Sequence, residues 1–208
     1  MAGHENVRRA GRTVRNVDRK AEIVQAAMEE IAEHGYRGAS LAAVADRVGL
    51  TQPGLLHHFP SKEALLVAVL EARDQWDIAS AALAGTSWPL DTMSTLVEYN
   101  AGRPGIVQVF SVLAGDSITE DHPAGAYFHN RYRALRESAE RALHSEFGDR
   151  MPGGLTPHEA APLLAAVMDG LQLQWLHDPE EVDMAASFRA FVRLLKGTAG
   201  RAGDTGQG

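Results

Sequence analysis

The sequence of 208 residues contains no cysteine, few aromatic residues and no long apolar run. The absence of cysteine excludes disulfides, zinc sites built on thiolates and cysteine nucleophiles, and it is consistent with a reducing cytoplasm. The longest apolar run, Ala64 to Leu70, is much shorter than the roughly 20 residues that a membrane-spanning helix needs. The first twenty residues lack an apolar core, so we expect no signal peptide. These absences predict a soluble, cytoplasmic protein with no membrane partner.

Negative charge dominates the chain, but it is unevenly distributed. The formal net charge is −7, while residues 1–62 hold nine Lys and Arg against seven Asp and Glu. Residues 63–208 hold eleven basic against twenty acidic residues. Since salt screens charges that lie more than about 10 Å apart, a polyanion responds to the local field rather than to the net charge. The basic N-terminal part is therefore compatible with nucleic-acid binding, although a basic tail can also be a solvated arm.

Hydrophobic periodicity predicts helices along the whole chain and few strands, hence an all-α fold. We expect a flexible basic arm over residues 1–17, followed by three short helices over 18–62 with Gly49 at the tight bend. A larger helical domain is expected over 63–197, and a glycine-rich disordered tail over 198–208. The domain organisation is therefore a small N-terminal module joined to a helical body.

Residues 20–70 carry a dense and gapless pattern. It includes Glu33-His34-Gly35-Tyr36, Val48-Gly49-Leu50-Thr51 and the run GLLHHFPSKEAL that starts at Gly54. This pattern resembles the tetracycline-repressor (TetR) family of bacterial regulators. The resemblance implies an N-terminal helix-turn-helix DNA-binding domain joined to a larger helical ligand-binding and dimerisation domain. It also implies a ligand-responsive transcriptional regulator, a repressor that a small, partly apolar molecule releases from its operator.

The third predicted helix follows Thr51 and has two faces. Leu55 and Phe59 stand one turn apart on the face that packs inward, which leaves polar residues for the opposite face. Gln52 presents a donor and an acceptor that suit an adenine edge, and Gly54 allows the backbone to approach DNA closely. Together with the resemblance, this pattern predicts the following DNA-binding residues: Ser40, Arg47, Thr51, Gln52, Pro53, Gly54, Leu55, Leu56, His57, His58 and Lys62.

Several residues of this set are expected to contact the DNA backbone rather than the bases. Ser40 and Thr51 stand at helix starts, where backbone amides and the helix dipole favour phosphate. Arg47 is a candidate phosphate contact, and Lys62 matches the family lysine that is expected to meet the DNA backbone. Leu56 departs from the family pattern, which commonly has a tyrosine in contact with the backbone at that position. The departure changes the expected register of the backbone contacts.

The resemblance also implies a ligand pocket inside the helical body. Aromatic and long side chains with a few polar groups are its candidate lining: Trp76, Tyr99, Arg103, Phe110, Phe128, Met168, Gln172 and Trp175. Each apolar member of this set is equally a candidate for ordinary core packing. The resemblance does not say which of these side chains line the pocket.

By the same resemblance, the last two predicted helices pair with those of a second copy as a four-helix bundle. They cover about 156–177 and 182–196, and the capping box Thr156-Pro157-His158-Glu159 predicts the start of the first. Their additional apolar residues are the candidate dimer contacts: Leu164, Met168, Leu171, Phe188, Phe191 and Leu195. The expected partners are double-stranded operator DNA, an unknown small-molecule effector and a second copy of the chain.

No sequence motif points to catalysis, a cofactor or a metal site. We find no glycine-rich phosphate loop, no nucleophile elbow and no metal-ligand spacing. The adjacent His57 and His58 point about 100° apart on a helix and cannot chelate one ion together. We therefore expect neither enzyme activity nor a cofactor. A helical adaptor that binds only protein is the alternative from another functional class.

Overall fold

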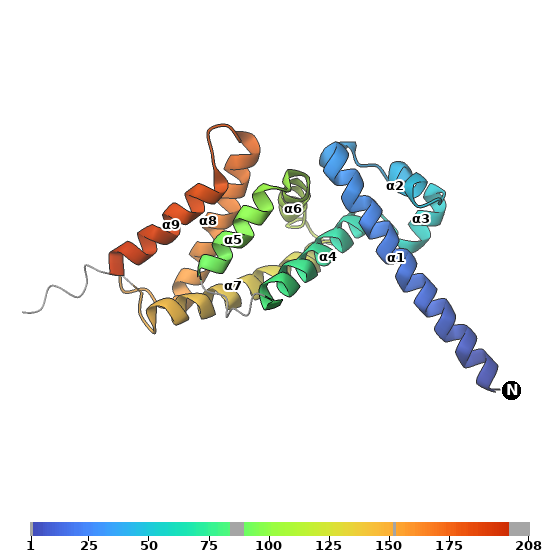
Figure 1. Ribbon diagram of the computed structural model, residues 1–208, viewed down its shortest axis with the longest axis horizontal. Coiled ribbons are helices and arrows are strands. Elements are labelled where there is room, and N and C mark those ends of the chain that lie inside the picture. Colours follow the sequence, from blue (N-terminus) through green and yellow to red (C-terminus); the bar gives the residue numbers. More distant parts are fainter. Residues whose placement is uncertain (1, 84–89, 152, 200–208) are drawn as a thin grey trace, which may run out of the picture. The chain divides into compact units, whose positions relative to one another are not determined.

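The computed structural model describes residues 2–83, 90–151 and 153–199, with side chains for 18–75, 90, 92–151 and 153–197. Across these ranges the regular secondary structure is entirely helical, which confirms the all-α prediction. Figure 1 shows the order of the elements. The helices are α1 (Ala2–Gly38), α2 (Leu41–Arg47), α3 (Gln52–His58), α4 (Lys62–Leu83), α5 (Leu90–Ala101), α6 (Pro104–Asp116), α7 (Gly125–Phe147), α8 (Pro157–His177) and α9 (Met184–Ala199). None of the helices in the described ranges combines the length and the apolar character that crossing a membrane requires.

The chain divides into two compact units, residues 1–73 and 74–208, which we call the N-terminal and C-terminal units. The division lies inside α4, later than the boundary at residue 62 that we expected. The boundary lies there because the first half of α4 is buried within the N-terminal unit. There Leu65 and Leu66 line a small apolar depression together with Ala27 and Val44. The N-terminal unit is therefore a three-helix module completed by the start of a fourth helix.

Local hydrogen bonds explain where α2 and α3 begin. The Ser40 hydroxyl accepts a hydrogen bond from the Ala43 amide at 3.1 Å, and Thr51 Oγ1 accepts one from the Gly54 amide at 3.2 Å. Each of these bonds satisfies an amide that the first helical turn leaves without a partner. Between the helices, Gly49 has a φ of 65°, a left-handed conformation that glycine adopts at low cost. The structure thus confirms both predicted helix starts and the glycine at the bend.

The beginning of α1 differs from the expected flexible arm over residues 1–17. Residues 2–17 continue α1 as a helix, and no proline interrupts this segment. At the other end, Gly35 has a φ of 69° and breaks the helix where a stop was predicted, although helical backbone resumes as far as Gly38. The predicted tail over 198–208 overlaps the last two residues of α9 and otherwise lies outside the described residues.

The core of the C-terminal unit is built by α5, α7, α8 and α9. α7 packs on α8, while α9 packs on both α5 and α8. The helix α8 begins at the predicted capping box, in which the Thr156 amide donates to Glu159 Oε2 at 2.8 Å and the Glu159 amide donates to Thr156 Oγ1 at 3.3 Å. This core holds the last two helices in place within a single chain.

The same core corrects part of the expected dimer interface. Leu164, Met168 and Phe188 are only 2%, 6% and 0% exposed, and all three belong to the core cluster. They contact neighbouring helices of their own chain and are not available to a second copy. Leu171, Phe191 and Leu195 are partly buried and pack against this cluster from its edge.

Candidate nucleic-acid interface

The helix α3 presents a polar face outward and an apolar face inward. Thr51, Gln52 and His57 are exposed, as is Pro53 in the first turn. Leu55 is 0% exposed, so it anchors α3 to the N-terminal unit and cannot contact DNA, contrary to its place in the predicted set. Thr51, Gln52 and Pro53 lie at the start of the helix, which is the end that helix-turn-helix proteins offer to the major groove, while His57 lies in the last turn.

Gly54 supports the start of α3 as well as leaving space for a close approach. A Cβ atom at this position would lie 3.3 Å from Thr51 Oγ1 and 3.8 Å from Leu50 Cδ2. Because the first of these distances is tighter than an ordinary van der Waals contact, a larger residue would press on the cap that Thr51 forms. Leu56 is half-buried on the same helix. Gly54 therefore serves the local geometry of the site in addition to its predicted role.

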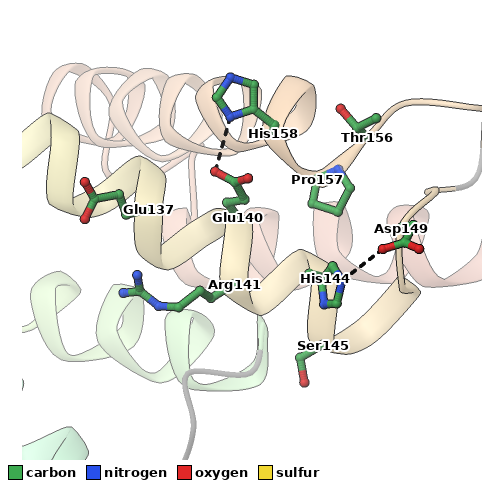
Figure 2. Close-up of a pocket in the computed structure, with 9 residues that line it drawn as sticks. All are labelled: Glu137, Glu140, Arg141, His144, Ser145, Asp149, Thr156, Pro157 and His158. Carbon is green, nitrogen blue, oxygen red and sulfur yellow. Dashed lines mark hydrogen bonds and ion pairs between the residues drawn. The ribbon is translucent and has the colours of Figure 1, made fainter.

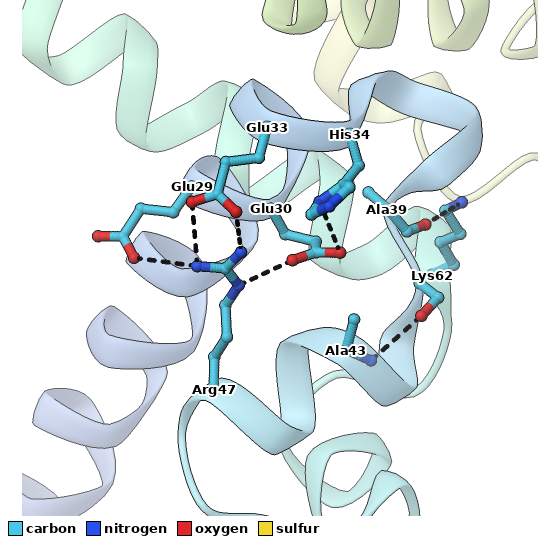
Figure 3. Close-up of polar contacts among 9 residues, drawn as sticks. Glu29, Glu30, Glu33, His34, Ala39, Ala43, Arg47 and Lys62 are labelled. Atoms are coloured by element: carbon cyan, nitrogen blue, oxygen red, sulfur yellow. Dashed lines mark hydrogen bonds and ion pairs between the residues drawn. The ribbon is translucent and has the colours of Figure 1, made fainter.

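Two basic side chains of the N-terminal unit, Lys62 and Arg19, are engaged within the protein. Lys62 Nζ donates to the carbonyl oxygen of Ala39 at 2.8 Å (Figure 3). It also donates to the carbonyl oxygen of Tyr36 at 3.3 Å, and the two bonds close the end of α1. Arg19 donates to the Val48 carbonyl oxygen at 2.7 Å, beyond the end of α2. The ammonium group of Lys62 thus joins the helices through two of its three N–H donors, and its contact with the DNA backbone stays a prediction.

Arg47 is also engaged within its own chain. Its guanidinium group points to α1, where it pairs with Glu30 and Glu33 and lies 3.9 Å from a Glu29 oxygen (Figure 3). The ligand-type atoms of Glu30, Glu33 and His34 lie within 4.8 Å of one another, a grouping that attracts positive charge. Arg47 supplies the positive charge at this place. Arg47 thus takes part in an internal ion-pair network, and its phosphate contact stays a prediction.

His58 closes α3 as a neutral side chain. Burial lowers the pKa of the His58 ring, and the charges of His57, Lys20 and Arg19 lower it further. Since an ordinary histidine titrates near pH 6.5, His58 is uncharged at neutral pH. It is half-buried and can offer one N–H to a phosphate, but no positive charge. A contact of His58 with DNA would therefore rest on a neutral N–H group.

Comparison with known proteins places this module in a family. Residues 23–69 match the family described as bacterial regulatory proteins, tetR family. This N-terminal module belongs to the TetR family. The chain is 29% identical over 180 residues to the HTH-type transcriptional regulator BetI of Burkholderia mallei, covering 82% of this chain and 88% of that protein. It is 24% identical over 191 residues to the regulator TtgR of Pseudomonas putida, covering 83% and 87%.

A solved structure has the same fold as this chain. A transcriptional regulator from Rhodococcus superposes with a TM-score of 0.63 at 20% identity, covering 85% of this chain and 95% of that one. The relatives are HTH-type transcriptional regulators, which confirms the predicted class of transcriptional regulator.

The expected ligand-binding residues differ in their packing and exposure. The Phe110 and Phe128 rings pack edge to face with their centroids 5.2 Å apart. In contrast, Tyr99 is 51% exposed, and its ring is covered on one side by the Arg103 guanidinium at 4.3 Å. Met168 belongs to the apolar core cluster, and the partly buried Trp175 packs against that cluster. Gln172 is half-buried, and the Trp76 side chain lies outside the described residues.

A polar network that the sequence did not reveal surrounds the Phe110–Phe128 pair. Tyr127 donates to Asp74 Oδ2 at 2.7 Å, and Arg131 forms an ion pair with Asp74 Oδ1 at 2.8 Å. The Arg131 guanidinium lies 5.3 Å from the Phe110 ring centroid. These residues are far apart in sequence, and only the packing of α4 and α7 brings them together. No local pattern marks Asp74 or Arg131 as special.

A second polar contact joins α7 to α8. Tyr132 donates its hydroxyl proton to Asp169 Oδ2 at 2.8 Å. Burial raises the pKa of the Asp169 carboxyl, although the Tyr132 hydrogen bond and Arg131 oppose the shift. Burial also raises the pKa of the Tyr132 phenol, and the bond to Asp169 raises it further. Both shifts favour the protonated form of each group.

The Tyr132 shift predicts a pH dependence of stability. Its folded pKa lies above the ordinary value of 10.0, so the unfolded chain loses the phenol proton first. This contribution to stability is complete below about pH 10 and is lost as the pH rises further. We expect Tyr132→Phe to show a smaller fall in the free energy of unfolding above about pH 10 than the unchanged protein. Urea unfolding at several alkaline pH values measures this free energy, with Tyr99→Phe as the exposed control. If the free energy of unfolding of Tyr132→Phe fell with rising pH as steeply as that of the unchanged protein, the prediction would be contradicted.

A pocket of about 660 Å³, lined mostly by polar residues, lies on α7, the loop that follows it and the start of α8 (Figure 2). Two histidine–carboxylate pairs cross it, His158 Nδ1 with Glu140 at 3.2 Å and His144 Nε2 with Asp149 at 3.1 Å. None of the predicted ligand-binding residues lines it. Its lining consists of Glu137, Glu140, Arg141, His144, Ser145, Asp149, Thr156, Pro157 and His158.

Proposed function

We propose that this TetR-family regulator is a ligand-responsive repressor that binds a near-palindromic operator as a homodimer in the bacterial cytosol. The observation that carries the proposal is the two-faced helix α3. It exposes Gln52 and His57 while Leu55 and Phe59 hold the other face in the core. A recognition helix needs this division, because it must be rigidly supported and still offer polar groups to base edges.

In the proposed complex, the first turn of α3 enters the major groove. Gln52 pairs with a base edge, His57 reaches a second base, and Thr51 with the amides of the first turn faces a phosphate. Two copies of α3 would lie about 34–36 Å apart, in successive major grooves of one operator. The half-sites would then be separated by one turn of the duplex.

The test is DNA binding to the region upstream of the protein's own gene, measured at several salt concentrations. We expect Gln52→Ala and His57→Ala each to lower the preference for operator over unrelated DNA by about 5- to 150-fold. The reason is that a good contact to a base edge contributes about 1–3 kcal/mol of discrimination. Circular dichroism should show that both variants stay folded, because both side chains are exposed.

The matched control is Gln25→Ala. Gln25 is an exposed glutamine on α1 whose side chain bonds to Glu29 of the same helix. Its removal should leave discrimination unchanged. The proposal fails if the unchanged protein retards no upstream fragment at low salt, or if Gln52→Ala and Gln25→Ala behave alike.

A second copy of the chain is the partner that we propose for the outer face of α8 and α9. Leu163 and Leu173 on α8 are 54% and 50% exposed, and Leu194 on α9 is 69% exposed. Between the two leucines of α8, Ala166 and Gly170 continue the same face at steps of three and four residues. This apolar stripe with small residues at its centre suits close packing of a symmetry-related helix. It replaces the buried residues of the interface that the sequence suggested.

We further propose that the effector binds in the C-terminal unit beside the Phe110–Phe128 pair. Aromatic surface with a few convergent polar groups, here from Asp74, Arg131 and Tyr132, is the usual lining of a small-molecule site. α4 begins with Lys62 in the N-terminal unit and carries Asp74 in the C-terminal unit. A ligand that shifts α4 would change DNA affinity by about 5- to 150-fold at a coupling of roughly 1–3 kcal/mol.

A further inference from the structure

A network of charged side chains joins α2 to α1 in the N-terminal unit. Arg47 Nε donates to Glu30 Oε2 at 2.7 Å, and the two terminal nitrogens of Arg47 donate to the two oxygens of Glu33, one of them at 3.3 Å (Figure 3). All three nitrogens of the guanidinium group are thus used on α1. We call Arg47, Glu30 and Glu33 the Arg47 clamp.

The clamp holds a buried charge. Glu30 is 4% exposed, and a carboxylate so placed needs a paired cation to offset its loss of hydration. Its second oxygen lies 3.2 Å from His34 Nδ1, so both of its oxygens have partners. The hydrogen bond from Arg47 also lowers the pKa of Glu33 below its ordinary value. Arg47 is therefore committed to its own chain.

The electrostatics of this face oppose a phosphate contact. Glu29, Glu30 and Glu33 place three carboxylates around one guanidinium group, so the local charge is negative even with Arg47 present. A phosphate that approached Arg47 would be repelled by its neighbours. The basic residue that the sequence pattern assigns to DNA is consequently shielded from it.

The position of the clamp gives it a different role. α2 spans only Leu41–Arg47, and the turn at Gly49 leads directly into α3. We infer that Arg47 is a positioning residue for operator recognition: it holds α2 against α1 and so sets the orientation of α3. This inference rests on the proposed operator binding, to which it adds an indirect determinant of affinity.

The first test removes one carboxylate at a time. Glu33→Gln breaks a charge-assisted pair with Arg47, whereas Glu29→Gln removes the same charge from the same helix at a distance of 3.9 Å without breaking a hydrogen bond to Arg47. The two residues are 54% and 52% exposed in their side chains, so both variants should fold. We expect operator affinity to fall about 3- to 10-fold for Glu33→Gln and to stay equal or rise slightly for Glu29→Gln.

The two variants separate the clamp from simple electrostatics. If only overall charge mattered, removing either carboxylate would strengthen binding to the polyanion. If Glu33→Gln binds operator as tightly as the unchanged protein does, the inference is overturned. Failure of the unchanged protein to bind any operator would instead overturn the proposed function, so the two failures are distinguishable.

The second test keeps the positive charge at position 47 but replaces the planar guanidinium group with an ammonium group. Arg47→Lys retains a cation, yet an ammonium group cannot reproduce the guanidinium fork that bridges Glu30 and Glu33. We expect affinity to fall about 3- to 10-fold without a change in the salt dependence of binding, because Arg47 neutralises no phosphate. If Arg47 instead bound a phosphate directly, Arg47→Lys would keep near-normal affinity. Arg47→Ala would then reduce the salt slope by about 0.9, the value for one neutralised phosphate, and either result would refute the positioning role.

Discussion

Replacement of both Leu163 and Leu194 by aspartate is expected to separate the proposed homodimer into monomers and to lower operator affinity by more than about 100-fold. The two leucines are 54% and 69% exposed in the single chain, so the change should not disturb its core. At a symmetric interface each substitution appears twice and buries four carboxylates without partners. A monomer then binds one half-site and loses the advantage of holding both.

Sedimentation velocity and a gel-shift titration measure the two effects on the same preparation. The control is Ile118→Asp, which changes a residue that is 87% exposed in the connection between α6 and α7. It adds the same charge away from α8 and α9 and should leave both the mass and the operator affinity unchanged. If the protein with both aspartates still sediments as a dimer, the outer face of α8 and α9 is not the interface.

Phe188→Ala is expected to lower the free energy of unfolding by about 3–5 kcal/mol, as for other large aromatic residues removed from a core. Phe188 is 0% exposed and lies in the cluster formed by α5, α7, α8 and α9. Its ring also packs against Phe191 at 6.2 Å between centroids. The cavity that the substitution leaves is enclosed by this one chain, so the destabilisation belongs to folding rather than to assembly.

Urea unfolding at a fixed protein concentration measures this destabilisation, because dimerisation makes apparent stability depend on concentration. Ile118→Ala is the control, and its free energy of unfolding should stay within about 0.5 kcal/mol of the unchanged protein. If Phe188→Ala weakened the dimer but left the stability of the monomer unchanged, the placement of Phe188 in the core would be wrong.

The features that were predictable from the sequence are local ones. Ser40, Thr51 and Gly49 act through bonds to residues within a few positions, so their pattern alone locates α2, the bend and α3. The same holds for the capping box of Thr156 and Glu159. The residues that resemble the TetR family are concentrated in this N-terminal module, which explains why the functional class was recognisable.

The roles of the charged residues were not predictable in this way. An arginine or lysine near a recognition helix has the same sequence signature whether it meets a phosphate or a carboxylate of its own chain. Arg47 donates hydrogen bonds to Glu30 and Glu33 on another helix. Lys62 donates to the carbonyl oxygens of Tyr36 and Ala39. These partners are decided by the packing of α1, α2 and α4, which no local pattern encodes.

The amino-acid sequence by itself determined an all-helical chain, the start of each capped helix and the two faces of α3, because these depend on neighbours within one or two turns. Only the tertiary structure decided which apolar face of α8 and α9 is core and which remains open. Phe188 and Leu194 are both apolar residues of one helix, yet one is 0% and the other 69% exposed. Helical periodicity places a residue on a face, but the neighbouring helices determine what that face meets.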